Sequence, residues 1–167
     1  MKRIMHQAVL AGVFAMAAGS AGAAVTVNYV APDKFADVPY AAAERDVTLQ
    51  TLTEHFNRLG SKLAPGQDLR IDVLDVDLAG HLVPSVSQGG DVRVLGEMGS
   101  DSPRIRLRFS LEQDGRVITS GEARLSDANY LKHRVRYSDN ESLRHEKVLL
   151  DQWFGQTFDA PLRTAGR

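Results

Sequence analysis

The chain has 167 residues, enough for one domain with its own core, and 43% of them are hydrophobic. Its 20 basic and 21 acidic residues give a formal net charge of −1, and this balance predicts no general attraction to nucleic acid. The absence of cysteine excludes disulfides, thiol catalysis, cysteine-ligated zinc and lipid attachment through a cysteine.

Residues 1–23 are typical of a secretory signal peptide. Lys2 and Arg3 form a positive start, residues 8–18 are apolar or glycine, and Ala21-Gly22-Ala23 matches the small-residue cleavage pattern. The apolar run is too short to span a bilayer, so no transmembrane segment is expected in the mature chain. We expect a soluble protein exported to the periplasm, with outright secretion as one alternative and a buried N-terminal helix as another.

The first predicted elements are a strand and a helix. Residues 25–30 alternate valine with polar residues and predict the strand. Residues 47–66 predict an amphipathic helix with Asp46 or Thr48 as its cap. Its apolar stripe, at steps of three or four residues, comprises Leu49, Leu52, Phe56, Leu59 and Leu63.

The second predicted strand is rich in aspartate. Residues 69–78 alternate apolar and polar side chains, with a break at Leu74 that predicts a β-bulge or a stretch buried on both faces. Residues 80–103 follow, rich in glycine, serine and proline, and only residues 92–95 resemble a strand. A connection this long in a compact domain is usually functional or disordered.

Residues 104–126 predict a β-hairpin. A two-residue turn at Asp114 and Gly115 would pair apolar with charged positions and so mix the two faces of the hairpin. A three-residue loop instead pairs Phe109 with Thr119 and keeps the faces separate. We therefore predict the three-residue loop, with Gly115 in the left-handed position of a bulge.

The C-terminal part predicts a second helix. Residues 133–137 are expected to add one more short strand. A capping box of Ser138 and Glu141 then starts a helix. Its apolar line, which ends in aromatic residues, carries Leu143, Lys147, Leu150, Phe154 and Phe158. Residues 161–167 are expected to form a loose tail.

Together these elements predict a single α+β domain over residues 24–160. A mostly antiparallel sheet of four to five strands is packed by two amphipathic helices, after the N-terminal signal peptide. The predicted core comprises Leu52, Phe56, Leu59, Ile71, Val73, Ile105, Leu107, Phe109, Leu150, Trp153 and Phe154.

Asp75, Asp77 and His81 are the candidates for a divalent metal or for acid–base chemistry. The two aspartates share one face of a regular strand, and the histidine follows four residues later. The segment begins like a calcium loop, but its fifth position is Ala79 and its twelfth is Val86, so that motif fails. The alternative is a polar row that faces solvent or discourages edge pairing.

The sequence contains no motif of an established catalytic centre. It has no metal-binding histidine pair, no G-x-S-x-G elbow and no glycine-rich phosphate loop. His55 and His145 are expected on the water-facing sides of their helices. No cofactor is therefore predicted.

A basic stripe is expected on one face of the sheet. It could meet anionic lipid, glycan or an acidic partner surface, although Glu122, opposite Arg106 in the predicted register, partly offsets it. The alternative is an ordinary solvated face. The stripe comprises Arg104, Arg106 and Arg108, with Arg93 and Arg124 nearby.

Five stretches in order along the chain carry a family resemblance. They are VTVNYVAPDKFADV, LRIDVLDVDLAG, PRIRLRFSL, GEARLSDANYL and EKVLLDQWF. They resemble the uncharacterised proteobacterial exported family called domain of unknown function 3016 (DUF3016). The resemblance implies an exported protein with no established activity, cofactor or catalytic residue. The order of elements is also loosely similar to small α+β envelope accessory proteins that assist transport machines, at the level of fold alone.

These observations predict a non-catalytic periplasmic accessory or binding protein whose envelope partner or ligand is unknown. Residues 80–103 and the arginine stripe are its expected contact surfaces. The alternative is a metal-dependent or hydrolytic enzyme that uses Asp75, Asp77 and His81. A third possibility is a stress-related structural protein with a weak, transient partner.

Overall fold

A computed structural model of the chain describes residues 23–85, 87, 90–96, 101–132 and 136–159. The expected signal peptide and C-terminal tail lie outside these residues, and so does most of the strand expected at 133–137. The elements are β1 (Ala24–Tyr29), the 3-10 turn η1 (Pro32–Lys34), α1 (Ala42–Gly60), β2 (Gln67–Asp77), β3 (His81–Ser85), β4 (Gly90–Val94), β5 (Arg104–Gln113), β6 (Arg116–Ser126), α2 (Arg144–Phe154) and the π-helical turn η3 (Gly155–Asp159).

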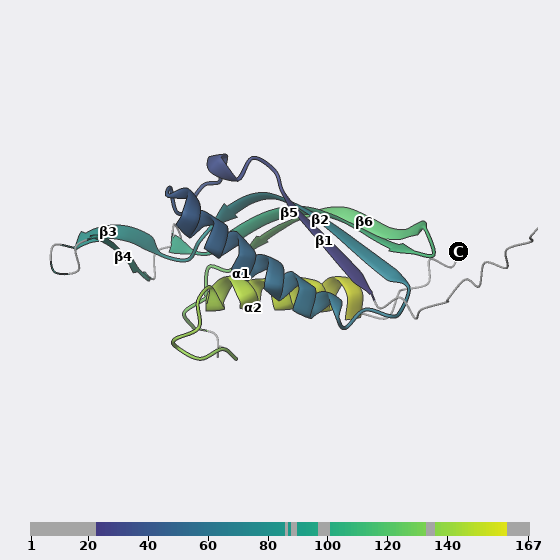
Figure 1. Cartoon of the computed structure of the whole chain (residues 1–167). Helices are drawn as coiled ribbons and strands as arrows, with labels where there is room; N and C mark the ends of the chain where they lie inside the picture. The colour runs from purple at the N-terminus through teal and green to yellow at the C-terminus, as the bar shows by residue number, and fades with distance from the viewer. Residues whose placement is uncertain (1–22, 86, 88–89, 97–100, 133–135, 160–167) are drawn as a thin grey trace, which may run out of the picture.

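The predicted α+β fold is confirmed, and its main sheet is mixed. The strand order is β1-β2-β5-β6, with β1 parallel to β2 and the other neighbours antiparallel. The parallel pair arises because α1 carries the chain back to the end of the sheet where β1 began. Both α-helices lie on one side of the sheet, so neither α1 nor α2 covers its other side (Figure 1). Among the described helices, none has the length and apolar character needed to cross a membrane.

The core lies between the sheet and the two helices. Leu69, Ile71 and Val73 of β2 point into it, and a register shift between Val73 and Asp75 confirms the predicted bulge at Leu74. The bulge lets Val76 point inward as well. The predicted core residues are buried, apart from Phe109, which is half-buried and packs against the others.

The helix α1 begins at Ala42, five residues before the predicted start. The predicted caps are wrong because Asp46 and Thr48 lie inside the helix, where the Thr48 hydroxyl donates to the carbonyl of Glu44. Alanine has the highest helix propensity, so the alanines that precede Glu44 extend the helix although no side chain caps it.

The helix α2 begins at Arg144, and the predicted capping box is wrong. Glu141 lies before the helix, where its carboxylate accepts a hydrogen bond of 2.7 Å from the ammonium of Lys147. Because Lys147 is buried, its charge needs a partner, and Glu141 supplies one instead of capping. Leu143, just before the helix, has φ 55°.

The turn between β5 and β6 also differs from the prediction. Asp114 has φ 52° and Gly115 has φ 75°, as in a two-residue type I′ turn. The next pairs are Glu112 with Val117 and Leu111 with Thr119, so Ile118 is an extra residue on β6. This bulge restores the separation of faces that a two-residue turn alone would lose.

Strands β3 and β4 form a separate hairpin that extends away from the main sheet (Figure 1). The expectation of an irregular segment at 80–103 is therefore wrong over most of its first half. Gly80 lies at the root of the hairpin with φ 81°, and a Cβ there would lie 2.3 Å from the carbonyl oxygen of Val94. The amide of Gly80 donates to the carbonyl of Asp101 at 2.8 Å, which closes the root.

Candidate functional site

The uncovered side of the main sheet, called the open face below, carries polar side chains in rows across the strands. Residues alternate between the two faces of a strand, so the positions between the buried ones all point outward. Across β2, β5 and β6 the register gives four such rows: Arg70–Ser110–Ser120, Asp72–Arg108–Glu122, Asp75–Arg106–Arg124 and Asp77–Arg104–Ser126.

The structure places three of the four candidate arginines on the open face and the fourth elsewhere. Arg104, Arg106 and Arg108 point outward from β5, and Arg104 donates to Asp77 at 3.1 Å. Arg93 lies on β4, where its guanidinium binds both carboxylate oxygens of Asp37 at 2.6 and 3.2 Å. Arg93 therefore holds the root of the hairpin and is not part of the stripe.

The partners of the other arginines differ from the predicted ones. Glu122 lies opposite Arg108, and Arg124 lies opposite Arg106. The pairing differs by two residues from the predicted register, one because the turn has two residues and not three, and one because of the bulge at Ile118. Glu122 also lies 3.7 Å from Arg124 along its own strand.

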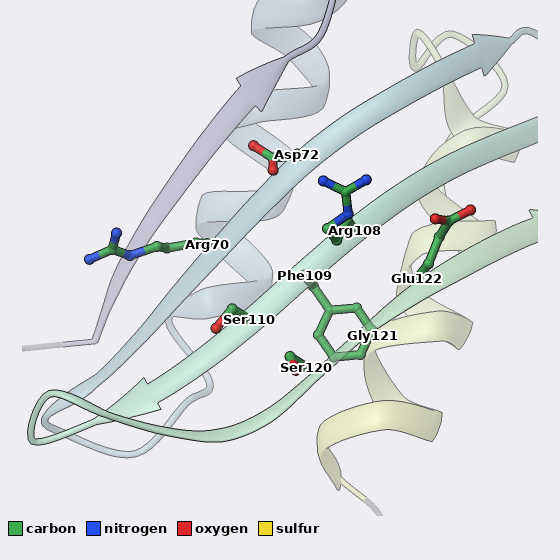
Figure 2. Close-up of a pocket in the computed structure, with 8 residues that line it drawn as sticks. All are labelled: Arg70, Asp72, Arg108, Phe109, Ser110, Ser120, Gly121 and Glu122. Atoms are coloured by element: carbon green, nitrogen blue, oxygen red, sulfur yellow. The ribbon is translucent and has the colours of Figure 1, made fainter.

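One hollow of about 510 Å³ lies on the open face over β2, β5 and β6. Figure 2 looks onto it, with the helices behind the strands and the side chains of Asp72, Arg108 and Glu122 along one margin. Phe109 and Gly121 also line the hollow, but the Phe109 ring lies on the helix side of the sheet, where it makes a T-shaped contact with Trp153 at 5.6 Å between ring centres. The hollow is therefore bounded by polar and charged side chains that rise from the strands.

A second hollow of about 460 Å³ lies farther along the same strands, towards the end of β6. It is lined by Asp75, Arg104, Ile105, Arg106, Arg124, Leu125 and Ser126. Arg106 makes no hydrogen bond or ion pair with any part of the chain that the structure describes. This hollow therefore presents more positive than negative charge.

The structure places Asp75 and Asp77 in adjacent rows of the open face, but His81 does not join them in a group of three. Asp75 accepts a hydrogen bond of 2.9 Å from the amide of Ala36, Asp77 binds Arg104, and His81 lies 3.2 Å from Asp101. Burial raises the pKa of Asp77, and the nearby Arg104 counteracts it. Within the described ranges no three histidine or acidic side chains form a group that could hold a metal. Metal binding by this trio stays a prediction.

A buried polar cluster joins the two helices, and no motif in the sequence predicted it. His55 is 1% exposed, so the expectation of a surface histidine is wrong. Its Nε2 lies 3.0 Å from Asp151, and its Nδ1 lies 2.7 Å from Arg58.

The cluster also includes Tyr137, whose hydroxyl donates to Asp151 at 2.7 Å. Burial lowers the pKa of His55 and raises that of Tyr137. A histidine three residues before an arginine is too common a pattern to reveal this cluster.

His145 is also buried, against the same expectation. The Tyr130 ring makes a T-shaped contact with its imidazole, with 4.8 Å between the ring centres. Burial is the main cause that lowers the pKa of His145, and Arg144 adds to it. The next residue, Glu146, is buried as well and accepts a hydrogen bond of 2.7 Å from the amide of Ala79. These contacts fix the start of α2 against the root of the hairpin.

Comparison with other proteins identifies a family and one distant structural neighbour. The crystal structure of protein XCC0632 from Xanthomonas campestris, of family DUF330, is similar at 15% sequence identity and a TM-score of 0.35, over 80% of this chain and 78% of that one. No curated protein matches the chain. The family described as "Protein of unknown function (DUF3016)" matches residues 23–156. The chain therefore belongs to the DUF3016 family.

Proposed function

We propose that this protein is a non-catalytic accessory or binding protein of the periplasm, and that it binds an anionic envelope component through the open face. The observation that carries the proposal is the pair Arg106 and Arg108. Both guanidinium groups project from the uncovered side of the sheet, and neither has a hydrogen bond or ion pair within the described part of the chain.

The chemistry of the face supports binding. Its polar groups are guanidinium, carboxylate and hydroxyl groups on β-strands, and strands hold such groups in fixed positions. Arginine is well suited to recognition of anions because its planar group donates several hydrogen bonds and keeps its charge at any physiological pH. The two hollows lie side by side along β5 and β6, so a ligand longer than one hollow has an extended track.

The proposed compartment rests on the N-terminal sequence. The basic start, the apolar run and the small residues at 21–23 support export. A cysteine-free chain needs no disulfide in an oxidising compartment, since its core is large enough to hold the fold.

Site-specific photocrosslinking in living cells tests the proposal. A photoreactive residue at Ser120, on the open face, is compared with one at Gln50, on the exposed side of α1. We expect a discrete, saturable adduct with an envelope component from position 120, and none from position 50. Absence of an adduct at 120, or equal adducts at both positions, would contradict the proposal.

A further inference from the structure

The second hollow contains an arrangement of charge that weakens the sheet. Arg106 and Arg124 are directly opposite each other on adjacent antiparallel strands. Like charges in this position are destabilising. The neighbouring row shows the favourable alternative, because there Arg108 lies opposite Glu122. The hollow thus contains a pair of like charges, Arg106 and Arg124, whereas the neighbouring row has the acidic Glu122 on β6.

We propose that the hollow lined by Arg104, Arg106, Arg124 and Ser126 binds a phosphate group of the ligand. The inference rests on the proposed function, since it names the chemistry that the open face recognises. An anion between Arg106 and Arg124 turns their repulsion into two attractive contacts, and this explains why both charges face one hollow.

The charge of the hollow favours an anion. Its lining holds three guanidinium groups and one carboxylate. Asp77 binds Arg104 and Glu122 lies 3.7 Å from Arg124, whereas Arg106 has no ion pair within the described residues. A phosphate monoester carries a charge of about −1.5 to −2 at neutral pH, whereas a carboxylate carries −1. The carboxylate of the lining, Asp75, is already held by the amide of Ala36 at 2.9 Å, so it is directed towards the edge of β2.

The donors favour a tetrahedral group as well. A planar carboxylate is satisfied by one guanidinium in a two-bond pair. Here two guanidinium groups come from different strands, and the Ser126 hydroxyl lines the same hollow. Phosphate oxygens point in several directions and can accept from all three. The shared chemistry is therefore a phosphate, free or carried by a lipid headgroup.

Amide NMR of protein expressed from the full chain, titrated with inorganic phosphate at constant ionic strength, tests the inference. We expect saturable shifts confined to amides of residues 104–106 and 124–126. In Arg106→Gln and Arg124→Gln the apparent Kd should rise at least tenfold. Arg116→Gln, a charge change of the same kind at the far end of β6, should leave the Kd unchanged. Unperturbed amides of α1, which lies on the other side of the sheet, confirm that each variant is folded.

Three results would overturn the inference. They are an absence of localised shifts with phosphate, an equal loss of affinity in Arg116→Gln, or acetate binding as tightly as phosphate. If photocrosslinking at Ser120 succeeds while phosphate fails, the open face binds a ligand of different chemistry. If phosphate binds and no crosslink forms, the hollow holds phosphate but the proposed envelope function is wrong.

Vesicles distinguish the two sources of phosphate. Sedimentation with vesicles that contain phosphatidic acid, whose headgroup is a phosphate monoester, but not with neutral phosphatidylcholine vesicles, and its loss in both hollow variants would identify a lipid headgroup. No sedimentation together with binding of inorganic phosphate would identify a soluble phosphate ligand, and both outcomes support the site. Sedimentation that persists in Arg106→Gln and Arg124→Gln would contradict it.

Discussion

His55 Nε2 lies 3.0 Å from Asp151 Oδ1, so a polar contact joins α1 to α2 on the buried side of the helices. The other oxygen of Asp151 accepts the hydroxyl of Tyr137, which precedes α2. One carboxylate therefore ties together three segments of the chain. Its loss leaves a buried imidazole without its charged neighbour and a tyrosine hydroxyl without its acceptor.

We expect Asp151→Ala to lower the free energy of unfolding by about 2 kcal/mol, because unsatisfied buried polar groups cost roughly 1–3 kcal/mol. Urea unfolding followed by circular dichroism measures the change. The matched control is Asp46→Ala, an exposed position on α1, which should stay within about 0.5 kcal/mol of the parent. Equal losses in the two variants would show that the cluster contributes nothing specific.

His55 should make stability depend on pH. Burial lowers its pKa from the ordinary value of 6.5, and Arg58 and Lys147 add to the shift while Asp151 opposes it. Between the lowered pKa and 6.5 the unfolded chain binds a proton that the native protein does not, so stability is full above 6.5 and falls as the pH drops below it.

The measurement compares urea unfolding at pH 7.5 and pH 5.5 in the parent and in His55→Gln. The loss between the two pH values should be smaller in the variant. His145, whose pKa is also lowered, adds to the loss of stability at low pH. Glu146, whose pKa is raised by burial, opposes that loss. Both residues are present in the parent and in the variant, so the difference between the two proteins reports on His55. An identical pH dependence in the two proteins would exclude His55 as its source.

Gly60, near the end of α1, should not tolerate alanine. In an exposed helix this substitution stabilises by up to about 1 kcal/mol. Here the added Cβ would lie 1.9 Å from Cγ2 of Val25 on β1, a side chain too stiff to move aside. We expect Gly60→Ala to destabilise by about 1–3 kcal/mol, the usual range for an overpacked core.

The double variant Gly60→Ala with Val25→Ala tests the cause. Removal of the clashing methyl groups should make the effect of alanine at position 60 much smaller than in the parent. Thermal unfolding of the four proteins of this cycle gives the coupling between the two sites. Additive effects would disprove the clash.

Two arginine-to-glutamine substitutions on the open face should have opposite effects on the free energy of unfolding. Arg124→Gln removes the repulsion with Arg106 and also a 3.7 Å contact with Glu122, which contributes little because both side chains are exposed, so stability should rise slightly. Arg108→Gln removes the attraction to Glu122 and should lower stability. Cross-strand charge pairs contribute roughly 0.2–1 kcal/mol, so the two variants should differ by about 0.5–1 kcal/mol. Urea unfolding at low salt measures the difference, which should shrink in 0.5 M NaCl. Changes of the same sign in both variants would contradict the assigned register.

The sequence predicted which face of a strand each residue occupies better than it predicted which residue lies opposite on the neighbouring strand. Alternation along Arg104–Gln113 is a property of the strand alone, so Ile105 and Leu107 could be assigned to the core directly. The pairing of Phe109 with Gly121 depends instead on a bulge at Ile118. The residues around Ile118 do not indicate a bulge there. The bulge depends on the whole hairpin, because it keeps the apolar residues of both strands on the same face.

In the candidate site, too, the orientation of residues could be predicted but their partners could not. The outward position of Arg104, Arg106 and Arg108 followed from spacing, but the contact of Arg93 with Asp37 joins residues 56 positions apart and could not be read from either segment. The burial of His55 and His145 was missed for a similar reason. Their neighbours in sequence are charged, and the groups that bury them belong to distant parts of the chain.

The bond from the amide of Ala79 to the buried carboxylate of Glu146 has a consequence for the order in which the protein forms. The two residues are 67 positions apart, and the bond attaches the root of the β3–β4 hairpin to the first turn of α2. A chain emerges from the ribosome from its N-terminus, so the hairpin is complete long before α2 exists. The contacts of Arg93 with Asp37 and of Gly80 with Asp101 can therefore form first, and the bond to Glu146 is the last of those that hold the hairpin's root.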